Sequence, residues 1–193
     1  MNKPIKLNLF IKLMLLPKAI LLWANYRIGT WLLRRRNKPM DFLIHPDPRL
    51  KQIAEPVDFA TETYEELSTI VRKMGNALAT ASYGGKLGLA APQIGINKRI
   101  IVCQGAVMFN PEWRPAKGQK NIITEGCYSA PKRLFKVERA QYGWAKWQSI
   151  AGVWREEKIN GLRAIIFQHE VNHLDGICCV DIGTEVKLNE NTA

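Results

Sequence analysis

An HExxH pattern at residues 169–173 constrains this chain more than any other feature of its sequence. On a helix, His169 and His173 are four residues apart and lie on one face, so both imidazoles can reach a single metal ion. Glu170 lies beside them, in a position that suits a carboxylate that takes a proton from water rather than one that binds the metal. The pattern therefore predicts a helix that carries two metal ligands and a general base.

Two histidines do not complete a catalytic metal site, since such sites usually take three protein ligands and leave one position to water. The candidates for the third ligand are Cys127 and Cys179, the latter six residues after the second histidine. Cys179 and Gly176 fall where metzincin peptidases, with the pattern HExxHxxGxxH, place their third histidine and their glycine. The residues alone do not decide which of the two cysteines is the third ligand.

The length of 193 residues suits one domain of ordinary size. The four cysteines show no spacing typical of secreted proteins, and two of them are adjacent, so we expect reduced thiols. The net charge of +11 is unevenly placed: residues 1–40 contain nine Lys or Arg and no acid, whereas residues 41–193 contain 19 basic and 17 acidic residues. A nearly neutral domain gives no support for specific nucleic-acid binding.

Residues 1–39 form a basic, apolar N-terminal extension ahead of a domain that we place at residues 40–193. Charges and Pro17 interrupt its apolar runs before they reach the ~18 to 20 residues that a membrane helix needs. Three interpretations stay open: an amphipathic membrane anchor, a targeting peptide, or sequence translated ahead of a true start at Met40. The lack of serine counts against an organelle transit peptide.

The remaining pattern predicts an α+β fold, with antiparallel strands packed around a central HExxH-bearing helix and one further long helix. The long helix is expected over about 63–82, because Thr63 and Glu66 form a capping box and apolar residues then recur at helical spacing. The HExxH helix is expected to start at Asn160-Gly161 and to stop at Gly176. Short apolar runs predict strands at 42–44, 100–103, 106–109, 122–124, 135–139 and 144–147, the last with a bulge or at an edge.

Three separated segments carry glycine, cysteine and histidine in a specific order: KLGLAAPQ at 86–93, EGCYS at 125–129 and QHEVNHL at 168–174. They resemble the three motifs of the peptide deformylase family, which are G-apolar-G-apolar-A-A-x-Q, EGCLS and QHExDHL. Weaker agreement elsewhere extends the resemblance over about residues 40–182. Three motifs in the right order make it a specific match.

Three positions depart from the family's motifs: Lys86 for glycine, Tyr128 for leucine and Asn172 for aspartate. Lys86 puts a long cation at the rim of the expected cleft, Tyr128 changes the wall beside the metal, and Asn172 removes a charge from the helix. None of them removes a ligand. The chain ends about twenty residues after His173, so it resembles short, phage-encoded members without a C-terminal helix.

The resemblance implies a metallohydrolase that removes the formyl group from N-formylmethionine at the N-terminus of nascent polypeptides and releases formate. It implies Cys127, His169 and His173 as the ligands of Fe2+, for which Zn2+, Ni2+ or Co2+ can substitute. A Cys-His-His site with one open position fits this chemistry independently, because the metal lowers the pKa of water enough to supply hydroxide near neutral pH.

Four further positions acquire catalytic roles from the resemblance. Glu170 would accept the proton of the attacking water and pass it to the leaving amine. Gln93 and the backbone amide of Tyr128 would donate hydrogen bonds to the developing oxyanion. Gly88 would let the backbone approach the site closely.

The methionine side chain of the substrate needs an apolar slot close to the metal. Leu162, Ile165 and Ile166 precede His169 by seven, four and three residues, so they share its helical face. Together with Leu87 they could form this slot.

The resemblance further implies N-formylmethionyl peptides and nascent chains at the ribosome as partners. We expect a monomer in the cytoplasm, or in the host cytoplasm if the chain is phage-encoded. An organellar or membrane-associated location, with membrane contact through residues 1–39, applies if the extension is genuine. Two alternatives stay open: a zincin-like metallopeptidase whose third ligand is Cys179, Glu185 or Glu190, and an inactive homologue that binds formyl peptides.

Overall fold

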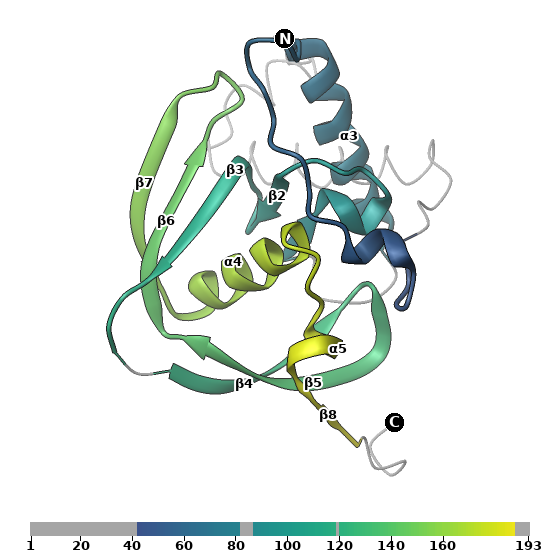
Figure 1. Cartoon of the computed structure of the whole chain (residues 1–193), viewed down its shortest axis with the longest axis vertical. Helices are drawn as coiled ribbons and strands as arrows, with labels where there is room; N and C mark the ends of the chain where they lie inside the picture. Colours follow the sequence, from purple (N-terminus) through teal and green to yellow (C-terminus); the bar gives the residue numbers. More distant parts are fainter. Residues whose placement is uncertain (1–41, 82–86, 119, 188–193) are drawn as a thin grey trace, which may run out of the picture. The chain divides into compact units, whose positions relative to one another are not determined.

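The computed structural model describes residues 42–81, 87–118 and 120–187. The N-terminal extension, Lys86 and Glu190 lie outside these residues. The described chain forms two antiparallel β-sheets with helices against them, and a helix bearing residues 161–174 follows most of the strands (Figure 1). The predicted α+β class with antiparallel strands is thereby confirmed. Within the described ranges, no helix combines the length and the apolar character that crossing a membrane requires.

The larger sheet has five strands in the order β1-β2-β3-β6-β7, and every neighbouring pair is antiparallel. Its strands are β1 (Gly88–Ala90), β2 (Ile100–Cys103), β3 (Ala106–Pro115), β6 (Tyr142–Gln148) and β7 (Trp154–Asn160). β6 lies between β3 and β7, and the register shift of this sheet lies in β3, between Phe109 and Glu112. The expected edge position of residues 144–147 is therefore wrong, whereas the irregular pairing falls opposite Trp147, with the extra residue in β3. Trp147 is buried while Trp144 lies under Arg114, so the two rings occupy opposite faces of a regular strand.

The smaller sheet has the order β4-β5-β8, formed by β4 (Lys120–Cys127), β5 (Ala130–Ala140) and β8 (Thr184–Val186). β4 and β5 pair as an antiparallel hairpin, joined by Tyr128 and Ser129. The sequence predicted only a part of each strand, residues 122–124 of β4 and 135–139 of β5. Cys127 is the last residue of β4, so the hairpin turn places its thiol at the end of this sheet.

The strand expected at 42–44 does not form, although these residues run alongside other segments. The backbone NH of Leu43 donates to Gln93 O at 2.8 Å, and that of His45 donates to Ser129 O at 2.8 Å. Gln93 belongs to a 3-10 helix, η2 (Ala91–Ile94), rather than to a strand. Pro46 and Pro48 follow, and they cannot donate to a ladder, so the chain enters a second 3-10 helix, η1 (Pro48–Lys51).

The long helix predicted near 63–82 is α3 (Tyr64–Thr80), and its capping box is present. The Thr63 NH donates to Glu66 Oε2 at 2.8 Å, and the Glu66 NH donates to Thr63 Oγ1 at 3.3 Å. These bonds satisfy two of the backbone donors that a helix start leaves without intrahelical partners.

The helix that contains the HExxH pattern is α4 (Gly161–Leu174), with Asn160 at its N-cap. The chain leaves the helix after Asp175 through Gly176, whose φ of +72° is the left-handed conformation that glycine adopts most readily. A Cβ on Gly176 would also lie 2.8 Å from the Lys51 carbonyl carbon. Conformation and close approach therefore both require glycine at this position.

α4 is apolar on several sides, and it is buried among strands of both sheets. It contacts β1, β2, β3, β6 and β7 of the larger sheet and β5 of the smaller one. Phe167 and Leu174 are fully buried in the cluster between α4 and the larger sheet. A helix that is covered by strands on several sides lies inside the domain, and its buried polar residues, among them Glu170 and His173, are therefore enclosed as well. A short helix, α5 (Cys179–Ile182), follows and packs on β5 and β4.

Candidate active site

Three side chains from two distant segments meet at one point of the fold. The Sγ of Cys127 lies 3.2 Å from His173 Nε2, which in turn lies 3.3 Å from His169 Nε2. Among the described residues, these three offer ligand atoms that all lie within 4.8 Å of one another and could hold a metal ion. One thiolate and two imidazoles are a donor set that suits a catalytic metal with one position left open.

Two of the alternative third ligands, Cys179 and Glu185, do not belong to this group of ligand atoms. Cys179 is outside this three-residue group, although its side chain contacts Cys127 in the same buried cluster. Glu185 is on β8 and pairs with Arg133 at 2.7 Å. Glu190 is beyond the described residues.

A buried ion pair orients His169. Its Nδ1 lies 3.0 Å from Glu125 Oε1, and Glu125 accepts two hydrogen bonds from Arg139, at 2.6 and 3.1 Å. Arg139 also donates to Asn172 Oδ1, one turn along α4. A carboxylate on Nδ1 directs Nε2 toward the metal position and raises the basicity of the ring. Sequence reasoning missed Glu125 and Arg139, although Glu125 belongs to the EGCYS segment.

The electrostatics of the two histidines differ. Burial lowers the pKa of His169, but the hydrogen bond with Glu125 and nearby negative charges outweigh it, so the pKa is raised overall. Burial holds the pKa of His173 well below its ordinary value, and the neighbouring His169 lowers it further. His173 is thus neutral at physiological pH, which is the form that binds a metal.

Glu170 is a buried carboxyl beside the three ligand atoms. Only 4% of the residue is exposed, and its Oε2 has no hydrogen-bond partner within the described chain. Burial raises the pKa of this carboxyl to about 7. A buried polar atom without a partner is costly, and Glu170 lines the pocket, so this oxygen favours a polar or charged species there. The residues present therefore fit a bound cation with a reacting water.

Gly88 packs directly against this carboxylate. A Cβ at residue 88 would lie 2.9 Å from Glu170 Cδ and 2.8 Å from Ile166 Cγ2. Atoms this close would have to move, so glycine is what allows β1 to approach α4 here. This contact supports the expectation that Gly88 lets the backbone approach the site closely.

Gln93 and Tyr128, the expected oxyanion donors, also lie at the site. Gln93 is 1% exposed; its Oε1 accepts from the Ala90 NH at 2.9 Å, and its Nε2 lies 3.3 Å from Cys127 Sγ. Tyr128 is 8% exposed and its ring stacks on Phe42 at 4.7 Å. The roles of both residues stay predictions.

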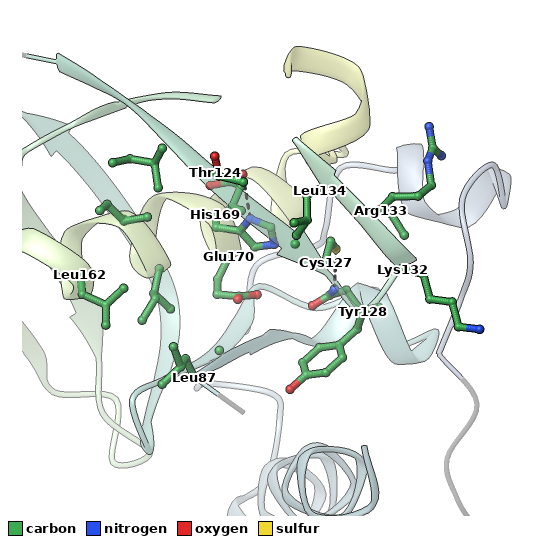
Figure 2. A pocket seen from close by; sticks show the side chains of 18 residues that line it. Leu87, Thr124, Cys127, Tyr128, Lys132, Arg133, Leu134, Leu162, His169 and Glu170 are labelled. Atoms are coloured by element: carbon green, nitrogen blue, oxygen red, sulfur yellow. Dashed lines mark hydrogen bonds and ion pairs between the residues drawn. The ribbon is translucent and has the colours of Figure 1, made fainter. Parts of the chain in front are cut away.

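A pocket of about 540 Å³ opens beside these groups. All four residues expected in the substrate slot line it: Leu87, Leu162, Ile165 and Ile166. Figure 2 shows Leu162 and Leu87 on one side of Glu170, and Leu134 on the strand across from α4. The helical spacing of residues 162–169 did not predict the opposite wall, which belongs to β4 and β5. Its residues are Ile123, Thr124, Gly126, Ala130, Lys132, Arg133 and Leu134.

The sequence of this chain matches those of known proteins. Residues 39–189 match the family model described as polypeptide deformylase. The peptide deformylase of Desulforudis audaxviator (strain MP104C) is 35% identical over 147 residues, which cover 74% of this chain and 92% of that relative. The chain belongs to the peptide deformylase family. The resemblance drawn from the three motifs is thereby confirmed.

Solved deformylase structures are similar as well. A Plasmodium falciparum peptide deformylase in complex with an inhibitor is 32% identical, with a TM-score of 0.68 over 75% of this chain and 89% of that one. A class I type b peptide deformylase from Acinetobacter baumannii bound to Met-Ala-Ser is 29% identical, with a TM-score of 0.68 over 75% and 98% of the chains. The chain is accordingly a metal-dependent hydrolase that removes the N-formyl group from nascent peptides. The peptidase and inactive-homologue alternatives are not favoured.

Proposed function

We propose that Cys127, His169 and His173 hold the metal of this deformylase and that the adjacent pocket binds N-formylmethionyl peptides. One observation carries the proposal: three ligand atoms within 4.8 Å of one another lie beside a buried carboxyl whose Oε2 has no described partner. We name Fe2+ as the native ion, with Zn2+, Ni2+ or Co2+ as substitutes, because one thiolate and two imidazoles suit borderline divalent ions. When bound, such an ion supplies Lewis acidity that makes water a nucleophile near neutral pH.

Glu170 supplies the proton transfers. Its carboxylate accepts the proton of the attacking water at Oε2, the atom without a described partner. It then gives this proton to the nitrogen of the leaving amine, which must be protonated before it can leave as a free amine. A carboxyl whose pKa is raised to about 7 can both take and give a proton near neutral pH.

Gln93 and the Tyr128 amide stabilise the negative charge on the formyl oxygen. Gln93 Nε2 lies 3.3 Å from Cys127 Sγ and 3.4 Å from Ser129 Oγ, and the Ala90 NH holds the other end of the amide. The NH2 group has two hydrogens, so its bond to the formyl oxygen would replace one of these two contacts, while the Ala90 NH keeps the carbonyl end of the side chain in place. The hairpin turn holds the Tyr128 backbone next to Cys127.

The pocket takes the methionine side chain against Leu87, Leu162, Ile165 and Ile166, all of which line it. Solved relatives bound to actinonin and to Met-Ala-Ser support a peptide-like ligand here. The partners are then nascent chains at the ribosome, and the enzyme acts as a cytoplasmic monomer, in the host cytoplasm if phage-encoded. Membrane contact or an organellar location rests on residues 1–39.

We also propose that α4 is the central element of the fold and that the domain begins at residue 40. The contacts of α4 with strands of both sheets support the first point. The family match beginning at residue 39 supports the second.

Formate release from a short formyl-Met peptide by anaerobically prepared protein tests the activity. Metal analysis of purified Cys127→Ala and Cys179→Ala proteins tests the ligand set. We expect Cys127→Ala to lose the metal, because two histidines alone leave the site short of a ligand. Cys179→Ala should still be purified with about one metal per chain. Loss of metal only in Cys179→Ala would instead support the peptidase ligand set.

A further inference from the structure

The β4–β5 hairpin has a bulge at the edge of the pocket. Cys127 pairs with Ala130, but the residue before Cys127 pairs with Leu134. Residues 131–133 of β5 therefore have no partners on β4. A bulge interrupts the ladder and redirects side chains, and bulges are common next to active sites. Here the second and third residues of the bulge are cations, and both line the pocket.

Lys132, in the middle of the bulge, has a φ of +61°, in the left-handed region that residues other than glycine rarely adopt. Among the described residues, Gln104 and Asn110 share this feature, and both have a local reason for it. Gln104 is in the two-residue turn between β2 and β3, and the Asn110 side chain exchanges two hydrogen bonds with the Val57 backbone. The Lys132 side chain has no such bond within the described chain. An unusual backbone conformation beside a pocket is an observation that points to function.

The neighbouring charges differ from Lys132 because they are compensated. Arg133 donates two hydrogen bonds to Glu185, at 2.7 and 2.9 Å. Glu125 is paired with Arg139 at 2.6 Å. Lys132 is exposed and forms no ion pair with any residue that the structure describes. Of the lysines and arginines described in the pocket lining, it is therefore the one without a counter-ion.

Lys132 lies away from the proposed methionine slot. Figure 2 shows it beyond Cys127 and Tyr128, whereas Leu162 of the slot lies on the other side of these two residues. A peptide whose formyl group is at the metal and whose methionine fills the slot leaves the lining on β4 and β5 for its next residues. The first residues after methionine are thus the part of the substrate that meets this cation.

We propose that Lys132 is a specificity-determining residue that favours N-formylmethionyl chains with an acidic side chain at the second or third position. This rests on the proposed binding of formyl peptides in the pocket. A lysine ammonium is a compact charge on a flexible stem, so it attracts a carboxylate without demanding one geometry. Because the side chain is exposed, the ion pair adds a modest preference that salt weakens.

Formate release from three C-terminally amidated peptides tests the preference: formyl-Met-Ala-Ser, formyl-Met-Asp-Ser and formyl-Met-Ala-Asp. Amidation removes the terminal carboxylate, which a nascent chain does not carry near its N-terminus. At low ionic strength, kcat/KM of an aspartate peptide should exceed that of the neutral peptide by about two- to fivefold, the size expected for an exposed ion pair. Salt at about 0.5 M should remove most of the difference.

Two variants of Lys132 separate its charge from its backbone conformation. Asparagine tolerates the left-handed region and is neutral, so Lys132→Asn should bring the aspartate-to-neutral ratio of kcat/KM to about one. Lys132→Glu should bring the ratio below one, because like charges repel. Lys136→Gln is the matched control, since Lys136 is an exposed lysine of the same strand outside the pocket lining. It should keep the wild-type ratio.

The remaining outcomes contradict either the inference or its basis. A ratio of about one in the wild-type protein, or an equal ratio in wild type and both Lys132 variants, overturns the role of Lys132. A preference that is lost in Lys86→Gly but kept in Lys132→Asn assigns the selection to Lys86 and overturns it as well. A wild-type protein that releases no formate from any of the three peptides overturns the proposed function instead.

Discussion

Glu170 and Gly88 are packed directly against each other at the candidate active site. One comes from α4 and the other from β1, and a Cβ on Gly88 would lie 2.9 Å from Glu170 Cδ. The carboxyl is therefore enclosed by backbone on one side, which contributes to the burial that raises its pKa to about 7. The same contact makes both residues sensitive to conservative changes.

Glu170→Gln is expected to retain the metal and to lower kcat by about 10² or more, the scale of a lost general base. The amide keeps the shape of the side chain, but it cannot accept a proton from water. Formate release and metal content of the same preparation check this. Near-normal turnover by the metal-loaded variant would contradict the role.

The same substitution should change how stability depends on pH in the metal-free protein. The Glu170 carboxyl has a pKa near 4.5 in an unfolded chain and about 7 in the folded one. Between these values the folded state binds more protons, so stability falls as the pH rises from about 4.5 to about 7 and levels off above 7. Urea unfolding at about pH 5 and pH 8 should show wild type losing up to about 3 kcal/mol relative to Glu170→Gln. Parallel pH dependences of the two proteins would argue against a raised pKa.

Gly88→Ala should lower kcat at least about tenfold, because the new methyl group displaces Glu170 or Ile166 and small shifts of catalytic groups are costly. Gly75→Ala is the matched control. Gly75 is in the interior of α3 with nothing within 4 Å of an added Cβ, so alanine should stabilise the protein by about 0.5–1 kcal/mol and leave kcat unchanged. Formate kinetics and thermal unfolding separate the two results. Equal kcat in all three proteins would show that the site tolerates the extra methyl group.

At the scale of elements, the β4–β5 hairpin supports α4 through its buried ion pair. Glu125 is on β4 and Arg139 is on β5, with only 9% and 5% of their side chains exposed. They reach His169 and Asn172 of α4. The register of the hairpin thus determines the orientation of a proposed metal ligand on a helix that is distant in sequence.

Arg139→Met should destabilise the protein by about 3–5 kcal/mol, because it leaves the Glu125 carboxylate buried without its cation. Metal affinity should also fall by about 10- to 100-fold, since Glu125 no longer holds His169 as firmly. The control on the same strand is Arg133→Met, whose partner Glu185 is 48% exposed, and which should cost about 1 kcal/mol or less. Urea unfolding and chelator competition measure both effects. Similar losses in the two variants would mean that the buried pair has no special role.

At the scale of the whole molecule, the domain and the N-terminal extension differ in character. Residues 1–40 carry nine of the 28 Lys and Arg residues and no acid, and the family match begins at residue 39. The two sheets, α3 and α4 belong to residues 64–186. The candidate active site draws on the same part of the chain, from Gly88 to His173.

A chain that starts at Met40 should therefore fold, hold its metal and release formate at close to the full-length rate. It should lose binding to anionic vesicles, because the extension combines leucines with Lys and Arg that can contact anionic headgroups. Co-sedimentation of both proteins with vesicles at two salt concentrations checks this. Identical vesicle binding by both would eliminate the anchor interpretation, and a shortened protein that does not fold would move the domain boundary.

The sequence by itself determined the features that depend on neighbours along the chain. The capping box predicted the start of α3, and Asn160, Gly161 and Gly176 predicted both ends of α4. Helical spacing placed His169 and His173 on one face, and the three motifs identified the family. These signals are local, because hydrogen bonds of a helix and its caps join residues at most a few positions apart.

Only the tertiary structure decided which distant groups meet. Spacing left Cys127 and Cys179 equal as partners of the histidines, and the β4–β5 turn brings Cys127 to 3.2 Å from His173 Nε2. The support of His169 by Glu125 and Arg139, and the strand wall of the pocket, were likewise invisible in the sequence. Pairing of antiparallel strands and the packing of α4 on them set these contacts. Such pairing depends on register and burial between segments tens of residues apart, which no local pattern specifies.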